Sequence, residues 1–220
     1  MKVTYEQIKN DERINTYIRQ ADESMRAMGF TEHSFAHVTK CAQMASSLLS
    51  DLGYSEREVE LARIAGYLHD IGNVVNRNDH AHSGALMAFR LLDELGMETQ
   101  DVAAVVTAIG NHDEHTAYPV NAVAAALILA DKSDVRRSRV RSRENIRDDI
   151  HDRVNYAVEQ AQLLLDKQAK TLTLTMTIDT AICPVMEYFE IFTTRMLLCR
   201  KAAVFFGLEF KLHINDAVIL

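Results

Sequence analysis

The chain of 220 residues has few residues that break helices and few that could crosslink it. Two prolines and eight glycines are typical of a helical protein, because chains built from many short turns need more of both. Its three cysteines are widely spaced and odd in number, which excludes a disulfide framework and predicts reduced thiols in the cytoplasm. Neither the N-terminal segment MKVTYEQIKNDERI nor the apolar stretch NAVAAALILA has the pattern of a signal peptide or a membrane span.

An excess of basic charge is also missing. The 24 basic and 31 acidic residues give a net charge of −7, which argues against general binding of nucleic acid. A hydrophobic content of 48% is enough for a substantial core. The chain is long for one domain and short for two equal ones.

Hydrophobic periodicity predicts that helices fill most of the chain up to about residue 168. Ser55 and Glu58 form a capping box, which predicts a helix start. Gly53, Gly72 and Gly96 stand where a helix would end in the left-handed conformation. The predicted helices cover residues 4–28, 34–52, 56–71, 82–95, 99–111, 119–132 and 144–168.

The pattern changes after residue 168. The segment TLTLTMTID alternates strictly and predicts a half-buried strand over 171–179. A long apolar helix over 183–206 and a second alternating segment, FKLHINDAVIL, follow it. We therefore expect a mainly α protein, with a helical domain over 1–168 and a small α+β subdomain of strand, helix and strand over 169–220.

Histidines and aspartates continue the apolar faces of five of these predicted helices. Ala62 and Ala65, for example, lead to His69 at helical spacing, so this histidine should point inward. An unpaired buried carboxylate costs several kcal/mol, and one or two divalent metal ions would explain why such groups converge. Asp70 has two oxygens and could bridge two ions. The complete set is His37, His69, Asp70, His82, His112 and Asp131.

The order of these residues resembles the HD superfamily of metal-dependent phosphohydrolases, whose signature is H…HD…D. Here the signature is formed by His37, by His69 and Asp70 in the segment HDIG, and by Asp131. His82 in HSGA and His112 in GNHDE resemble the branch of the superfamily that holds two metals. The resemblance covers roughly residues 30–135.

The resemblance implies an HD-domain helical bundle, one metal held by His37, His69, Asp70 and Asp131, and another held by Asp70, His82 and His112. It leaves the metal open among Fe, Mn, Co, Ni, Zn and Mg. Many members of the superfamily carry a lysine directly after HDIG, whereas this chain has Asn73. The branch that cleaves cyclic dinucleotides has a GYP signature, and this chain departs from that branch at Asp113 and Ala117.

A run of basic residues, DKSDVRRSRVRSR, begins at Asp131. Since arginine forks suit phosphate oxygens, we predict that residues of this run bind substrate phosphate, with Asp70 and Lys132 in catalytic roles. The alternative is a solvated face or contacts with acidic groups. The predicted substrate-binding residues are Lys132, Arg136, Arg137 and Arg139.

Other candidate residues have plainer interpretations. His33 is expected to mark a helix start, and Cys41 to be a small buried residue. His80 and His115 are expected in loops that flank the site.

The expected function is hydrolysis of a small phosphorylated molecule, preferably a nucleotide, by metal-activated hydroxide. Two alternatives stay open: a di-iron oxygenase of the same superfamily and a nucleotide sensor without catalysis. We expect no membrane partner. The apolar segments after residue 168 suggest a homodimer interface or a lid.

Overall fold

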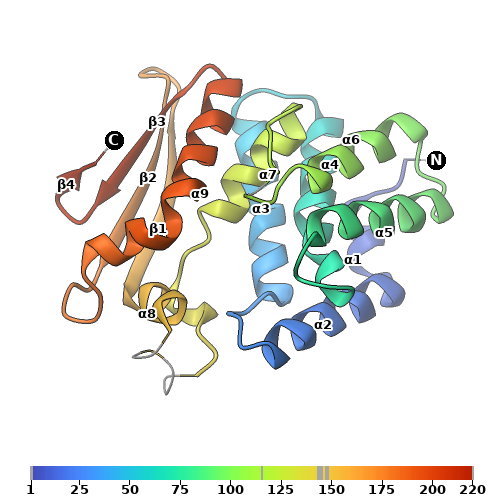
Figure 1. The fold of residues 1–220 in the computed structure, drawn as a ribbon. Helices are drawn as coiled ribbons and strands as arrows, with labels where there is room; N and C mark the ends of the chain where they lie inside the picture. The colour runs from blue at the N-terminus through green and yellow to red at the C-terminus, as the bar shows by residue number, and fades with distance from the viewer. Residues whose placement is uncertain (1, 115, 143–145, 147–148, 220) are drawn as a thin grey trace. The chain divides into compact units, whose positions relative to one another are not determined.

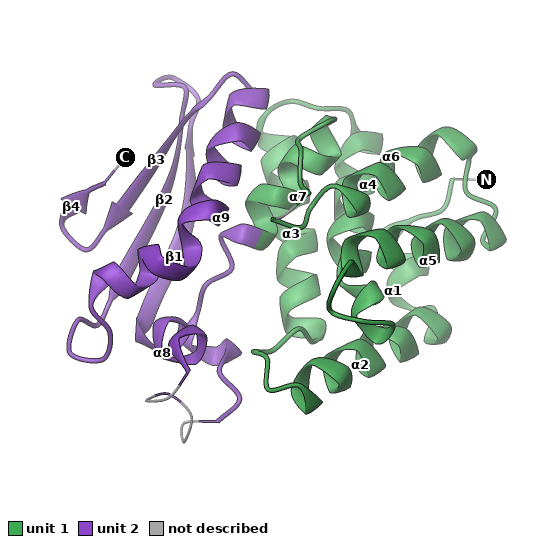
Figure 2. Ribbon diagram, in the orientation of Figure 1, with its two compact units in different colours: residues 1–131 green, residues 132–220 purple. Residues whose placement is uncertain are grey.

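The computed structural model describes residues 2–114, 116–142, 146 and 149–219 (Figure 1). The chain divides into two compact units, residues 1–131 and 132–220 (Figure 2). The predicted fold class is confirmed, since helices make up the first unit and a small sheet with its helices makes up the second. Among the described residues, no helix combines the length and hydrophobicity needed to span a membrane.

The first unit is a bundle of helices whose mutual packing places several helix ends together. The helix α3 packs against α4, α5 packs against α6, and the short 3-10 helix η1 packs against both α2 and α5. The helices are α1 (Tyr5–Lys9), α2 (Glu12–Ala27), α3 (Phe35–Asp51), α4 (Glu56–Leu68), η1 (Ile71–Val74), α5 (His80–Glu94), α6 (Thr99–Gly110) and α7 (Ala122–Lys132).

The predicted helix over 4–28 is two helices. Asn10 ends α1, and the side chain of Asp11 accepts hydrogen bonds from the backbone N–H groups of Arg13 and Ile14 at the start of α2. An aspartate at this position supplies an acceptor to the unpaired N–H groups of a new first turn, which favours a break in the helical segment. The capping box of Ser55 and Glu58 is confirmed.

Gly72 serves a different purpose from the one predicted. Gly53 and Gly96 have φ angles of 84° and 75°, as helix-ending glycines should. Gly72 instead lies inside η1, where a Cβ atom would come within 2.0 Å of the His80 carbonyl oxygen and 2.5 Å of the Gly84 nitrogen. Glycine is therefore needed here because η1 and α5 approach each other so closely.

The second unit contains a four-stranded sheet in the order β1-β2-β3-β4. The strands β2 and β3 are parallel and are connected by α9, which packs against β3. The predicted alternation is confirmed, because Leu172, Leu174, Met176 and Ile178 are all buried. The elements are η2 (Arg137–Arg139), α8 (Ile150–Ala157), β1 (Val158–Asp166), β2 (Thr171–Ile178), α9 (Val185–Phe205), β3 (Glu209–Ile214) and β4 (Ala217–Val218).

The helix predicted over 144–168 is wrong for its second half. The short helix α8 gives way to β1, which pairs antiparallel with β2 so that Leu163 lies opposite Leu174 and Leu165 opposite Leu172. Residues 143–145 and 147–148 lie outside the described residues. The compact units divide at 131/132, whereas the predicted domains divide at 168; β1, which lies before residue 168, belongs to the sheet of the second unit.

Candidate metal centre

Five imidazole rings lie in one continuous series inside the first unit. The ring centroids are 5.7 Å apart for His33 and His37, 5.1 Å for His37 and His69, and 5.0 Å for His69 and His112. The rings of His112 and His80 are also 5.0 Å apart. All five residues are buried, so the series lies in the interior of the bundle.

The series forms because helix ends meet at this place. His37 lies in the first turn of α3, and His69 directly follows α4. His80 is the first residue of α5, and His112 follows the residue that caps α6. Asp131 lies in the last turn of α7. A side chain at a helix end can turn inward without displacing the apolar residues that fill the middle of the bundle.

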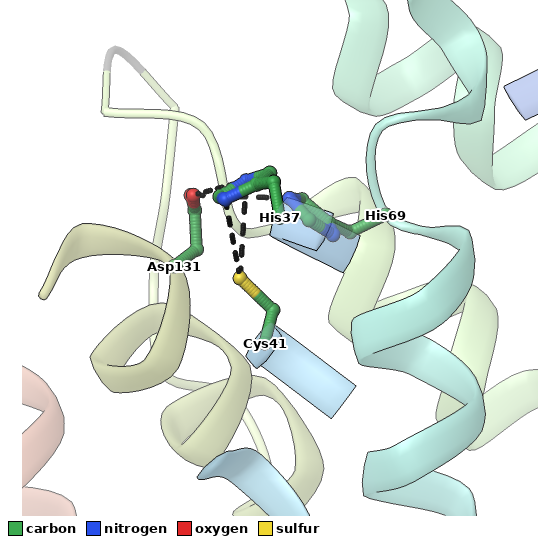
Figure 3. A group of neighbouring side chains, drawn as sticks. All are labelled: His37, Cys41, His69 and Asp131. Carbon is green, nitrogen blue, oxygen red and sulfur yellow. Dashed lines mark hydrogen bonds and ion pairs between the residues drawn. The ribbon is translucent and has the colours of Figure 1, made fainter. Parts of the chain in front are cut away.

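One group of side chains gathers around His37 and His69 (Figure 3). The Nε2 atom of His37 lies 3.3 Å from Asp131 Oδ1 and 3.5 Å from Asp70 Oδ2. The Nε2 atom of His69 lies 3.3 Å from Asp70 Oδ2 and 3.7 Å from Asp131 Oδ1. Each of the two imidazoles therefore faces both carboxylates, as ligands that share one metal ion would.

A second group involves the other oxygen of Asp70. The Nε2 atom of His80 lies 3.5 Å from Asp70 Oδ1 and 3.2 Å from His112 Nε2. The Oδ2 atom of Asp70 faces His37 and His69, so this carboxylate stands between the two groups. A carboxylate that bridges two ions needs this position.

Backbone carbonyl groups set the tautomer of three of the imidazoles. The Nδ1 atoms of His69, His80 and His112 lie 2.8, 3.0 and 2.6 Å from the carbonyl oxygens of Gly66, Arg77 and Ile109. A carbonyl oxygen only accepts hydrogen bonds, so each Nδ1 carries a proton, and in the neutral form of each ring Nε2 presents a lone pair.

These lone pairs fit a metal ion. The Nε2 atoms of His80 and His112 face each other at 3.2 Å, where two lone pairs repel unless a cation or a proton lies between them. Both atoms could reach one ion at the usual metal–nitrogen distance of roughly 2.0–2.1 Å. The Nε2 atom of His69 is buried and makes no hydrogen bond of good geometry, although Asp70 lies nearby. Imidazoles whose Nδ1 is held in this way are typical of metal sites.

Asp70 is an ionised carboxylate in this setting. Burial raises its pKa, but the positive charges that His69 and His33 carry when protonated and the hydrogen bond from His37 outweigh burial and hold the pKa well below its usual range. Asn73 is buried, and its Nδ2 donates to Asp70 Oδ1 at 2.9 Å. Asn73 therefore orients this carboxylate.

Cys41 lies in the cluster, whereas only a small buried residue was predicted at this position. Its Sγ lies 3.7 Å from His37 Nδ1 and 3.8 Å from His37 Nε2. Two sets of residues bring one ligand atom each within 4.8 Å of one another. A thiolate suits softer metals, so this residue favours zinc or iron over magnesium if it binds the ion. The sets are His37, Cys41, His69 and Asp131, and His69, Asp70 and His112.

His82 does not reach the cluster. Its side chain is 56% exposed, and its Nδ1 lies 3.7 Å from Asp79 Oδ1 at the surface. The stripe of Ala85, Leu86 and Phe89 that continues from His82 was predicted to face the core, and only Ala85 does so, since Leu86 and Phe89 are 71% and 50% exposed. The buried face of α5 begins with His80, carries only small side chains as far as Ala88, and ends with Leu91 and Leu92. Small residues let α5 approach its neighbours closely, and their spacing was the available signal.

His33 also has a larger role than a helix start. Its backbone N–H donates to Asp22 Oδ1 at 2.8 Å, and its Nδ1 lies 2.7 Å from the carbonyl oxygen of Thr31. These contacts hold its ring against His37. His115 lies outside the described residues.

The predicted substrate-binding arginines have partners within the second unit. The Nε atom of Arg136 donates to Asp134 Oδ1 at 3.0 Å, and Arg139 Nη1 donates to the Asp134 carbonyl oxygen at 3.0 Å. Arg137 donates to the carbonyl oxygen of Tyr156 at 2.6 Å. Lys132, Asp134 and Arg139 are buried. These contacts favour the alternative in which the run bonds to acidic and backbone groups.

The family model of the HD domain matches residues 34–165, which is more than half of the chain. The chain therefore belongs to the HD domain family. His37, His69, Asp70 and Asp131 all fall within the matched region, as do His80 and His112. Membership supports a metal-dependent hydrolase in general terms and agrees with a cluster that could hold a metal ion.

Two individual proteins resemble the chain. The uncharacterized protein MJ1020 of Methanocaldococcus jannaschii is 23% identical in an alignment of 162 residues, and the alignment covers 64% of this chain and 62% of that protein. The chain thus spans less than two thirds of the length of this relative. A crystal structure described as a predicted HD superfamily hydrolase, from an uncultured Thermotogales bacterium, is 29% identical with a TM-score of 0.46. The likeness covers 56% of this chain and 67% of that chain.

Proposed function

We propose that the protein is a metal-dependent phosphohydrolase that cleaves a phosphate ester or anhydride of a small molecule, and that the small molecule is a nucleotide. One observation carries the proposal. Imidazole lone pairs and two carboxylates from separate helix ends point at one another, and the buried Nε2 of His69 makes no hydrogen bond of good geometry. Membership of the HD domain family supports hydrolysis in general.

The proposed ligands differ from the predicted set at one position, where His80 replaces His82. His37, His69, Asp70 and Asp131 would hold one ion, with the Cys41 thiol beside them. Asp70, His80 and His112 would hold the other. A bound divalent ion lowers the pKa of its water toward neutrality and so supplies hydroxide near pH 7.

The side chains and carbonyl groups of the chain prepare the site for an anion. Carbonyl groups at Gly66, Arg77 and Ile109 fix three imidazoles, and Asn73 fixes Asp70. Two divalent ions held by the carboxylates of Asp70 and Asp131 leave an excess of positive charge. This excess favours a substrate whose reacting group is negatively charged, as a phosphate is.

We also propose a cellular location and an oligomeric state for the enzyme. The three cysteines are buried and form no disulfide, which supports the proposal of reduced thiols and a location in the cytoplasm. A homodimer formed through the second unit is likewise proposed, and a mass measurement in solution tests it.

Metal analysis followed by a substrate screen tests the proposed function. The purified protein should contain iron, manganese, cobalt, nickel, zinc or magnesium, and it should release phosphate from nucleotides or phosphate esters with that metal. Turnover should persist without oxygen, because hydrolysis consumes none. Iron together with oxygen consumption would favour the oxygenase instead, and a nucleotide that binds without turnover would favour a sensor.

A further inference from the structure

Arg77 reaches the candidate metal centre without being one of its proposed ligands. It lies between η1 and α5, and its Nη1 is 3.3 Å from Asn73 Oδ1, 3.4 Å from His80 Nε2 and 3.9 Å from Asp70 Oδ1. Its side chain is 26% exposed, whereas those of His80 and Asp70 are 3% and 6% exposed. The guanidinium group therefore extends from the surface to the buried cluster.

Two contacts hold Arg77 at this place. The carbon of its guanidinium group lies 5.9 Å from the centroid of the Phe30 ring, close enough for a cation–π contact. The carbonyl oxygen of Arg77 is also the acceptor for the Nδ1 proton of His80. One residue thus orients a proposed metal ligand through its backbone and brings a positive charge to the same ligand through its side chain.

The observed contact with His80 is incompatible with a bound ion. The Nδ1 atom of His80 carries the proton, so Nε2 has a single lone pair. That lone pair can accept a hydrogen bond from Arg77 or bind a metal ion, but not both. Divalent ions would also repel the guanidinium, and the nearby carboxylate of Asp70 would be neutralised by the ions that it holds. In the metal-loaded protein Arg77 therefore needs a further negatively charged partner beside the ions.

We propose that this partner is the phosphate group of the substrate, and that Arg77 binds its oxygens at the metal centre. The inference rests on the proposed function. The planar guanidinium group of arginine can donate paired hydrogen bonds to phosphate oxygens. Arg77 also supplies a positive charge beside the cluster, whereas the side chain of Asn73 is a neutral amide. The arginines of the 136–139 run are less suited, because they bond to Asp134 and to backbone groups of their own unit.

The test is the affinity of inorganic phosphate for the full-length, metal-loaded protein, measured by titration calorimetry together with the metal content. Arg77→Ala should weaken phosphate binding by about tenfold or more, since a charge-assisted hydrogen bond is lost. Metal content should be unchanged, and Arg77→Lys should recover part of the affinity. Arg90→Ala is the matched control. Arg90 lies on α5, its side chain is 81% exposed, and it pairs only with Glu94 among the described residues.

Three results would overturn the role of Arg77. They are phosphate affinity in Arg77→Ala within twofold of the wild type, equal loss of metal from Arg77→Ala and Arg77→Lys, and no phosphate binding by the metal-loaded wild type. The proposed function fails separately. If phosphate binding depends on Arg77 while no phosphate compound is hydrolysed, Arg77 keeps its role as an anion-binding residue and the hydrolase proposal falls.

Discussion

At the scale of single residues, the site shows for which side chains the sequence predicts an orientation toward the core. His37, His69 and Asp131 continue faces made of ordinary core residues, and the structure brings them together. His80 could not be found in the same way. The face of α5 that it begins contains Gly84 and Ala88, whose small side chains add little to a hydrophobic pattern.

Because His80 replaces His82 among the proposed ligands, a matched pair of variants tests the assignment. His80→Ala should lower the affinity for one of the metal ions by at least about tenfold, because a nitrogen ligand beside His112 and Asp70 is lost. His82→Ala should retain the metal content of the wild type, since its side chain is exposed. Elemental analysis after dialysis checks both. Loss of metal from His82→Ala with retention in His80→Ala would reverse the assignment.

At the scale of helices and strands, the close approach of η1 to α5 determines where the proposed ligands lie more than the hydrophobic pattern does. Gly72 lets η1 come against α5, and this contact places Asp70 and His80 in one cluster. The segment HDIG therefore contains two proposed ligands, His69 and Asp70, together with Gly72. This glycine lets a third proposed ligand, His80, approach them. The sequence shows the glycine but not its purpose, because a tight contact between segments depends on tertiary structure.

A substitution at Gly72 should show this effect. Gly72→Ala places a Cβ atom 2.0 Å from a backbone oxygen, and overpacking of this kind lowers the free energy of unfolding by about 1–3 kcal/mol or more. Gly110→Ala is the control, since its Cβ would meet only the Cβ of Ala85 at 3.6 Å, an ordinary contact. Denaturant unfolding measures both free energies. Equal stability of the two variants would contradict the close-packing account.

The strand β1 is the second feature at this scale that the sequence did not predict. Its residues include Ala161, Gln162 and Leu163, which form helices readily when no partner strand is present. Pairing with β2 overrides that preference, and β1 exposes much of its surface because it is an edge strand. The strand β2 was predictable because its alternating residues are buried along one face. An edge strand gives a weaker signal than a central one.

At the scale of the whole molecule, the sequence predicted the helical class and the small sheet but not where the compact units divide. The proposed ligands lie on different helices of the first unit, and they include buried charged and polar groups. Without cations, such groups destabilise the folded state through desolvation and through lone pairs that face one another. Metal binding and the stability of the first unit should therefore be linked.

Removal of the metal should accordingly lower the melting temperature. An ion present at about 100 times its dissociation constant stabilises the folded state by roughly 2.7 kcal/mol, which corresponds to about 5–10 °C for a protein of this size. Calorimetry before and after chelation, and after the metal is restored, measures the shift. His69→Ala should show no such shift, because it lacks a central ligand, whereas His82→Ala should behave like the wild type. If chelation leaves the melting temperature of the wild type unchanged, the buried imidazoles and carboxylates do not depend on a metal ion for their stability.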